Sequence, residues 1–577
     1  MKKKLLPALI VTGLIILVVI IMGITALINK YTPTKKTEDL KEYFNISSDD
    51  EAALIVDNEL SDYKAKIIDK KIYVDYKFVH DSLNSRFYWD ANENVLLYTT
   101  ASDIISAAAD SNSYSVTKQT NDFGYPIVKA TSDSALIALD YVKQYSNITF
   151  KSYDDPARIV ITSKWDEIDS ATVSKSTQVR VKGGIKSPIL KEVKKDDKIT
   201  LLDSGDKWDK VATEDGVIGY IKSKALSESK KTKLTNPDYE EETFTHIKKD
   251  KDICLAWNQV TSQSANSKVP QVISSTKGIN VMSPTWFYLN DNNGNLADIA
   301  SKDYVSYCHS QGIEVWGLFS NFENTDVDAA YVLTHTSTRT TLINQIMSAA
   351  FNYELDGVNI DFENITEAAY GDSYIEFIRE LAIKCHNNGI SLSVDVTVPA
   401  SFNKFFNRSD MANFADYIVI MGYDEHYKGS DAGSVSSIPW VTEGVESTLK
   451  EVPADQIILG MPFYTRIWEL TPKEDDDAVT DTEDQSKYTV ASQVYSMDAA
   501  AAQLATNNAT AALDEESGQN YAEWSVSNKL YKVWLEDNTS LENRLKLVDD
   551  NKLAGAAFWK LGFENSSVWD TVIKYLD

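Results

Sequence analysis

Hydrophobic residues form one long uninterrupted run near the start of the chain and only short runs elsewhere. Residues 5–28 are 24 consecutive uncharged positions, and as a helix they would extend about 36 Å, enough to cross the apolar core of a bilayer. Three lysines follow Met1 and favour a cytoplasmic N-terminus, which places everything after Asn29 outside the cell. A cleaved signal peptide is the alternative, but its apolar region is usually about 7 to 15 residues long. We predict an uncleaved anchor over residues 1–30.

From Lys251 onward, short β-rich apolar runs alternate with amphipathic stretches of helical period. This alternation is typical of a parallel βα fold. Because there are eight such runs, we predict a closed (β/α)8 TIM barrel, of fold class α/β, over residues 245–577. The predicted strands are 253–260, 279–289, 314–321, 357–363, 391–398, 417–424, 457–464 and 554–562.

Smaller segments separate the anchor from the predicted barrel. Residues 31–51 begin with a polar stretch and are predicted to form a stalk. Residues 52–165 contain a weak internal repeat, a helix followed by two short strands, whose copies start near Phe78 and Tyr141. The repeat predicts a small α+β module, and it resembles the copper amine oxidase N-terminal-like domain. That name implies no copper here, because the segment has a single His and no Cys.

Residues 170–227 are predicted to form a small β-barrel, because short strands at close spacing alternate with turns such as Lys182-Gly183-Gly184. The order of the strands, with Lys207-Trp208-Asp209 and then Gly219-Tyr220-Ile221, resembles a bacterial SH3 domain. The resemblance implies contact with cell-wall peptide or glycan, or a spacer without a ligand. Residues 228–244 are charged and predict a linker.

Composition excludes several classes of function. The net charge of −28 repels phosphate backbones, so nucleic-acid binding is not expected. Three Cys cannot form a disulfide framework, and none of the six His lies three or four residues from another. We therefore expect neither a dedicated metal site nor a cofactor.

The strongest chemical pattern is LDGVNIDFEN, residues 355–364. In a strand, Val358, Ile360 and Phe362 would share one face, while Asn359, Asp361 and Glu363 would share the other. Burying two carboxyl groups is costly unless they are paired, hydrogen-bonded or protonated. Their pKa values are therefore expected to diverge, which leaves a protonated general acid beside an ionised carboxylate, as glycosidic cleavage requires. The alternative is a solvated strand end or a structural ion pair.

This segment resembles the D-G-x-D-x-D-x-E signature of glycoside hydrolase family 18, and the similarity extends from Lys251 to Asp577. The resemblance implies that Glu363 is the general acid, that Asp361 orients the 2-acetamido group of the substrate and that Tyr423 holds this group. It also implies that the N-acetyl oxygen, and no enzyme carboxylate, attacks the sugar, with net retention. Residues 469–552 resemble the small α+β insertion of the family.

Eight further residues are candidates for substrate binding. Most occupy positions that match family motifs, such as Met421-Gly422-Tyr423-Asp424, and Trp286 is added because it lies on the second predicted strand. For the aromatic members, ordinary barrel packing is the alternative. The candidates are Asp356, Asn359, Met421, Asp424, Tyr464, Arg466, Trp559 and Trp286.

Asn359 stands where many chitinases have an aspartate that shares a proton with the next one. An amide removes like-charge repulsion, so we expect Asp361 to stay ionised. The D-G-V-N-I-D-F-E variant, with Trp257 on the first strand, resembles the branch of spore cortex-fragment-lytic N-acetylglucosaminidases, which acts on peptidoglycan.

The sequence thus predicts a membrane-anchored, extracellular glycosidase of a Gram-positive bacterium. Its partners would be N-acetylglucosamine-containing glycan, the cell wall through the two accessory modules, and the membrane through residues 5–28. The alternatives are a non-catalytic glycan-binding barrel, a chitinase or chitobiose-cleaving enzyme of the same family, or a structural tether.

Overall fold

The computed structural model describes residues 5–363, 365, 370–473 and 485–576, and it contains two compact units. The acidic tract at 474–484 lies outside the described residues. The first unit comprises Met1–Trp89, Ala107–Tyr114 and Asn121–Glu241, and the second comprises Asp90–Ser106, Ser115–Thr120 and Glu242–Asp577.

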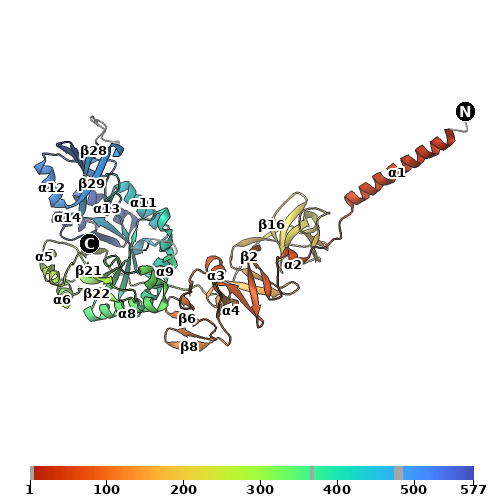
Figure 1. Ribbon diagram of the computed structural model, residues 1–577, viewed down its shortest axis with the longest axis horizontal. Helices are drawn as coiled ribbons and strands as arrows, with labels where there is room; N and C mark the ends of the chain where they lie inside the picture. Colours follow the sequence, from red (N-terminus) through yellow and green to blue (C-terminus); the bar gives the residue numbers. More distant parts are fainter. Residues whose placement is uncertain (1–4, 364, 366–369, 474–484, 577) are drawn as a thin grey trace. The chain divides into compact units, whose positions relative to one another are not determined.

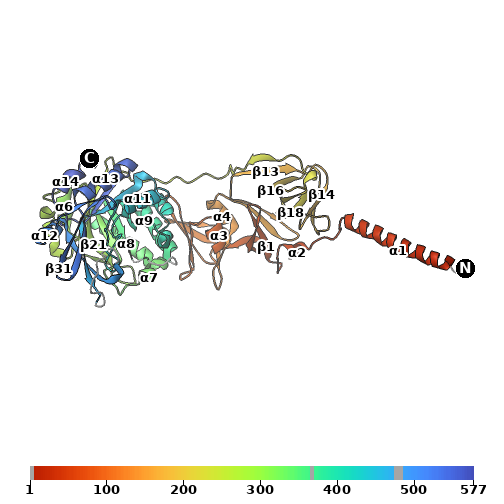
Figure 2. The ribbon, with the colours of Figure 1, turned by 90° about the horizontal axis from the view of Figure 1, so that it is seen from above.

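The apolar N-terminal run forms a single helix, α1, over Leu5–Tyr31 (Figure 2). Its segment Pro7–Tyr31 is strongly apolar and is not buried in the protein. By length and composition this helix is able to cross a bilayer. The single-pass topology stays a prediction.

Two seven-stranded sheets build the first unit, and Figure 2 shows β13, β14, β16 and β18 of the second sheet. Helices α3 (Tyr76–Ser82) and α4 (Leu139–Tyr145) each precede a pair of strands, as the repeat predicts. The first sheet, β11-β12-β1-β2-β3-β10-β9, contains Thr149–Tyr153, Arg158–Thr162, Glu51–Val56, Glu59–Ile68, Lys71–Asp75, Ala135–Ala138 and Val128–Ala130. The second, β15-β14-β18-β17-β16-β13-β19, contains Ile189–Val193, Thr177–Arg180, Ile218–Lys222, Trp208–Thr213, Lys198–Asp203, Glu167–Thr172 and Lys230–Lys233.

The boundaries of the predicted stalk and linker are wrong. Helix α2 (Leu40–Tyr43) is capped by Asp39, and Phe44 is fully buried in a cluster that includes Ile55 and Val211. The end of the stalk is therefore part of the core. Strand β19 pairs with β13, although its four side chains are all exposed. Because an exposed edge strand has no apolar pattern, its sequence resembles that of a linker.

The hydrophobic cluster around Phe44 contains residues from both sheets, so the two predicted modules share one core. The SH3 and copper amine oxidase-like assignments stay predictions.

Eight parallel strands form the closed barrel of the second unit (Figure 1). Strand β20 pairs with both β33 and β21, which closes the ring. All eight predicted strands are confirmed. They are β20 (Ile253–Asn258), β21 (Val281–Leu289), β23 (Glu314–Ser320), β24 (Gly357–Asp361), β25 (Ser391–Thr397), β26 (Tyr417–Met421), β27 (Ile457–Pro462) and β33 (Gly555–Trp559). A short strand, β22 (Leu296–Asp298), pairs antiparallel with β21.

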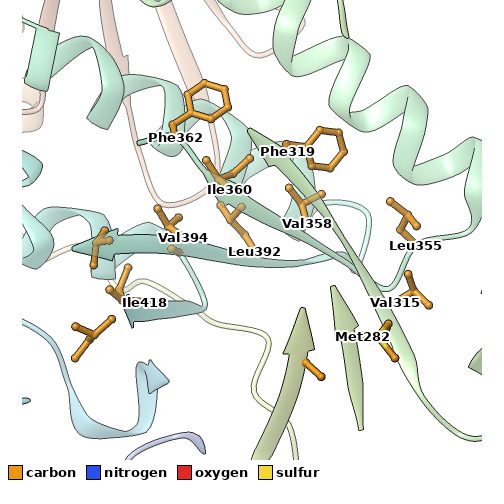
Figure 3. Close-up of a cluster of buried hydrophobic side chains, with 14 of the residues drawn as sticks. Met282, Val315, Phe319, Leu355, Val358, Ile360, Phe362, Leu392, Val394 and Ile418 are labelled. Carbon is orange, nitrogen blue, oxygen red and sulfur yellow. The ribbon is translucent and has the colours of Figure 1, made fainter. Parts of the chain in front are cut away.

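Each barrel strand divides its side chains between two cores. Val358, Ile360 and Phe362 of the β24 segment point outward, together with Leu392 and Val394 of β25 (Figure 3). The inward set forms a separate cluster containing Trp257, Trp316, Leu318, Tyr417 and Val419. The period of two predicted for residues 357–363 is therefore confirmed, and it sends Asn359 and Asp361 into the barrel.

An insertion lies between β27 and β33, as predicted. Its antiparallel sheet has the order β29-β28-β32-β31-β30, with helix α12 (Met497–Thr506) after β29 and helix α13 (Asn538–Asn551) leading back to the barrel. The five strands are Tyr488–Ser496, Tyr464–Pro472, Lys529–Leu535, Gln519–Val526 and Ala512–Asp514.

Residues 90–106, predicted as part of an accessory module, instead belong to the barrel unit. Asp90 accepts hydrogen bonds from Thr336 N and Oγ1, both at 2.6 Å, at the start of helix α8 (Thr336–Tyr353). Thr99, at the end of strand β5 (Val95–Thr99), donates to Glu376 of helix α9 (Gly371–His386) at 2.8 Å. This segment therefore caps α8, which has no side-chain cap of its own, and satisfies a buried carboxylate inside α9.

Substitution Asp90→Ala is expected to lower the free energy of unfolding of the barrel unit by about 1 to 2 kcal/mol, because it removes the cap of α8. Chemical denaturation followed by tryptophan fluorescence would measure the change. Glu446→Ala, at an exposed position of helix α11 (Ile438–Thr448), is the control. Equal stability of Asp90→Ala and the control would contradict the capping role.

Candidate active site

A cavity of about 800 Å³ opens among the C-terminal ends of the barrel strands. In this fold, that end of the barrel is where catalytic groups are placed. Six carboxyl groups line the cavity, and no Lys, Arg or His is among its described lining residues. The six are Glu323, Asp361, Glu363, Asp395, Asp424 and Glu425.

Asp361 and Glu363 both reach this cavity, as predicted. Asp361 is the last residue of β24 and is only 6% exposed to solvent. Its Oδ1 atom has no hydrogen-bond partner among the described residues. Burial raises the pKa of Asp361 well above its usual value, and the charges of Asp395, Glu363 and Glu323 add to the effect. Burial also raises the pKa of Glu363, with smaller contributions from Asp424 and Glu323.

Asn359 lies below the cavity and is not among the residues that line its wall. It is fully buried, and its Oδ1 accepts hydrogen bonds from Trp257 Nε1 and Ser283 Oγ, both at 3.0 Å. Its Nδ2 donates to Ser393 Oγ at 3.0 Å and to Asp395 Oδ1 at 2.7 Å. All four amide interactions are satisfied by the protein, which leaves none for a ligand.

Asn359 does not leave Asp361 without a like-charged neighbour. Asp395, on the neighbouring strand β25, restores the like charge that the asparagine removes. Sequence reasoning missed Asp395 and Glu323. The signal for Asp395 was present in SLSVDVT, where Ser391, Ser393 and Asp395 alternate with apolar residues and therefore point inward. Glu323 follows β23 in a loop, where no period marks it.

Tyr423, Met421, Asp424 and Trp559 line the cavity, as predicted. Burial raises the pKa of Tyr423 well above its usual value, and the charges of Asp361 and Asp395 add to it, so the phenol stays neutral. The ring of Trp257 meets Tyr423 edge to face at 6.4 Å and Trp559 at 6.0 Å between centroids. These three rings therefore form one packed wall.

Tyr464 and Arg466 stand behind the cavity and do not line it, which corrects their assignment. The hydroxyl of Tyr464 donates to Asp424 Oδ1. The guanidinium of Arg466 lies 3.9 Å from the same oxygen and donates to Ser492 Oγ at 3.2 Å. Both side chains hold Asp424 in place rather than contacting a ligand.

Asp356 and Trp286 are not among the residues that line the cavity. Asp356 precedes β24 at the opposite end of the barrel, where it accepts from His309 Nε2 and Val315 N, both at 2.8 Å. Trp286 is fully buried in the outer core, and its Nε1 donates to Asn266 Oδ1 at 2.8 Å. Trp286 is near the end of β21, but it points outward, and the strand's irregular register before Phe287 explains why counting positions misplaces it.

Besides Tyr288 and Trp440, three exposed aromatic residues at the cavity were not predicted. Phe322, Phe402 and Tyr427 are exposed and lie in connections after β23, β25 and β26. Phe402 is 76% exposed, so it is not held by core packing. Flat apolar faces at a polar cavity suit the C–H faces of pyranose rings.

Trp286→Ala and Trp559→Ala should separate core packing from ligand contact. Trp286→Ala is expected to lower the free energy of unfolding by about 3 to 5 kcal/mol. Trp559→Ala is expected to weaken binding of N-acetylglucosamine oligomers about tenfold, since that factor corresponds to ~1.4 kcal/mol. Denaturant titration and calorimetry would measure the two effects. A binding defect in folded Trp286→Ala, with none in Trp559→Ala, would reverse these assignments.

Comparisons with known proteins agree with this geometry. Residues 318–564 match the model of the glycosyl hydrolases family 18. The uncharacterized glycosylase YvbX of Bacillus subtilis (strain 168) is 24% identical over 302 residues, covering 49% of this chain and 81% of the relative. The cortical fragment-lytic enzyme of the same organism is 24% identical over 287 residues, covering 48% of this chain and 63% of the relative.

Among solved structures, the Bacillus cereus spore cortex-lytic enzyme SleL has a TM-score of 0.50 and 19% identity, covering 57% of this chain and 76% of that one. This likeness supports the barrel fold. The family match covers less than half of the chain. Together with the glycosylase relatives, it identifies the protein as a glycosidase.

Proposed function

We propose that the protein is a membrane-anchored, extracytoplasmic glycosidase that hydrolyses β-linked N-acetylglucosamine in peptidoglycan or its fragments. The observation that carries the proposal is the pair Glu363 and Asp361, which stand in a cavity at the C-terminal end of the barrel with raised pKa values. A protonated carboxyl beside a buried carboxylate is the arrangement that glycosidic cleavage needs.

Glu363 is the general acid in this proposal. Its pKa is raised by burial and by neighbouring negative charge, so its carboxyl keeps a proton closer to neutral pH than an exposed glutamate does. The proton passes to the glycosidic oxygen as the bond from that oxygen to the anomeric carbon breaks. The resulting carboxylate then accepts a proton from the water that completes hydrolysis.

Asp361 and Tyr423 are suited to hold the 2-acetamido group. The Oδ1 atom of Asp361 is buried without a partner and accepts the amide N–H, while the neutral phenol of Tyr423 donates to the amide oxygen. Held in this way, the amide oxygen attacks the anomeric carbon as the leaving group departs and forms an oxazolinium ion. Water opens the ion and returns the original anomeric configuration.

Several observations support peptidoglycan as the substrate class. The proposed mechanism requires an N-acetyl group at the cleaved sugar. The exposed rings of Phe322, Phe402 and Tyr427 at the cavity offer platforms for further sugars. One similar curated protein is named a cortical fragment-lytic enzyme, and cortex is a peptidoglycan. Helix α1 and the accessory sheets fit an enzyme held at the inner surface of a cell wall.

Glu363→Gln should abolish hydrolysis, because the amide keeps the side-chain shape and removes the proton donor. We expect a loss of kcat of ~10²-fold to 10⁴-fold. Full-length protein in detergent would be incubated with purified peptidoglycan and with N-acetylglucosamine oligomers, and the products read by mass spectrometry. Wild-type activity should decline as pH rises through the raised pKa of Glu363.

The matched control is Glu446→Gln, an exposed glutamate on helix α11, which should retain full activity. If the protein cleaves only the N-acetylglucosamine oligomers and not peptidoglycan, the substrate is chitin-like glycan rather than peptidoglycan. Retention of glycan by wild type and Glu363→Gln, with no products from either, would indicate a binding barrel and refute the enzymatic proposal.

The anchor makes a separate prediction about location. In a Gram-positive host, the full-length chain should sediment with membranes, and added protease should remove the barrel from intact protoplasts. A chain that starts at Tyr31 behind a cleavable signal should appear in the medium. Release of the full-length chain into the medium, with a new N-terminus near residue 30, would instead identify residues 1–30 as a signal peptide.

A further inference from the structure

Asp395 is a buried carboxyl group beside the catalytic pair to which the proposed mechanism gives no role. It lies on β25, is 4% exposed, and still contributes to the wall of the cavity. A carboxyl group at such a place is costly to bury, so its retention calls for an explanation beyond packing.

The local geometry ties Asp395 to the residue that departs from the family pattern. Its Oδ1 accepts a 2.7 Å hydrogen bond from Asn359 Nδ2, and Asn359 is held in turn by Trp257 and Ser283. The amide must present its nitrogen to Asp395, because its oxygen is occupied by two donors. The position of Asp395 is thus set by a rigid buried network.

The charged and titratable groups around this carboxyl are nearly all acidic. Glu363 faces it from the end of β24, while Asp361 and Glu323 complete the negative cluster around the reacting position. Tyr374 of α9 and Tyr423 after β26 face both aspartates as neutral phenols. No cation is among the described residues that line this cavity, so two full negative charges on Asp361 and Asp395 would be uncompensated.

We propose that Asp361 and Asp395 share one proton, so that Asp395 supplies from the neighbouring strand the second carboxyl group that Asn359 does not provide. Asp395 is a positioning residue: it acts through Asp361 and leaves the acid step to Glu363. This inference rests on the proposed function for its role in turnover, but the shared proton is a property of the folded protein.

The shared proton has a defined place during the reaction. When substrate binds, Asp395 keeps the proton and Asp361 carries the charge that accepts the acetamido N–H. No proton enters or leaves the pair, and no charge is added to the cavity. Two like carboxyl groups that interact strongly titrate as a pair in two steps, and the intermediate state holds one proton.

Infrared difference spectroscopy would detect this proton directly. The experiment uses full-length protein in detergent with a Glu363→Gln background, which removes the other protonated carboxyl of the site. The C=O stretch of a protonated carboxyl at neutral pH should be present in this background. It should weaken when either Asp361→Asn or Asp395→Asn is added, because the remaining aspartate loses the neighbouring carboxyl group that shares its proton and is then held protonated only by burial and, for Asp361, by Glu323.

The decisive variant exchanges the two groups. Asn359→Asp combined with Asp395→Asn returns a second carboxyl group beside Asp361 on its own strand, and the protonated band should return. A purely structural role for Asp395 predicts no change in the band in any variant. An unchanged band after Asp395→Asn, or no recovery in the exchanged variant, would overturn the proposal.

Two further measurements complete the test, and the first requires neither activity nor a folded Asp395→Asn variant. Labelling aspartate with ¹³C in the Glu363→Gln protein should shift the band if the proton is on an aspartate. This experiment does not need the Asp395→Asn variant to fold. An unshifted band would refute the shared proton. In active protein, the alkaline limb of kcat/KM should show two proton losses for wild type and one for Asp395→Asn. A wild type that cleaves nothing refutes the proposed function, while the infrared result still decides the proton.

Discussion

The cost of burying carboxyl groups inside the barrel is the constraint on which the site depends. Strand β24 places Val358, Ile360 and Phe362 against the surrounding helices, and the same period of two forces Asn359 and Asp361 into the lumen. A carboxyl group taken from water into that space favours its protonated form. The chemistry of the site therefore follows from the outward packing of the strand as much as from the acids themselves.

Neighbouring strands then determine what each acid does. Asn359 is saturated by contacts from β20, β21 and β25, so it orders the floor of the cavity without meeting a ligand. Tyr464 and Arg466, from the insertion, fix Asp424. Residues that family motifs suggest as ligand contacts thus serve as supports for the residues that do reach the cavity. Precise placement of reacting groups depends on such supports.

The barrel also depends on a segment far from it in the sequence. Residues 90–106 cap α8 through Asp90 and reach the buried carboxylate of Glu376 through Thr99. Glu376 in turn accepts from Arg379 at 2.9 Å, so the contact joins an internal ion-pair network of α9. The accessory region is therefore not simply a spacer, because part of it completes the folding unit that carries the active site.

The sequence by itself determined the eight barrel strands, the anchor-like helix and the pairing of Asp361 with Glu363, because each has a local signal: a period, a long apolar run or a spaced motif. Tertiary structure decided the rest. Trp286 lies in a barrel strand and Asp356 directly before one, yet Trp286 points outward and Asp356 lies at the opposite end of the barrel from the cavity. Asp395 joins Asp361 only because β24 and β25 are neighbours in the sheet. Such partners are separated along the chain, so no local pattern reveals them, and only the register of the closed barrel brings them together.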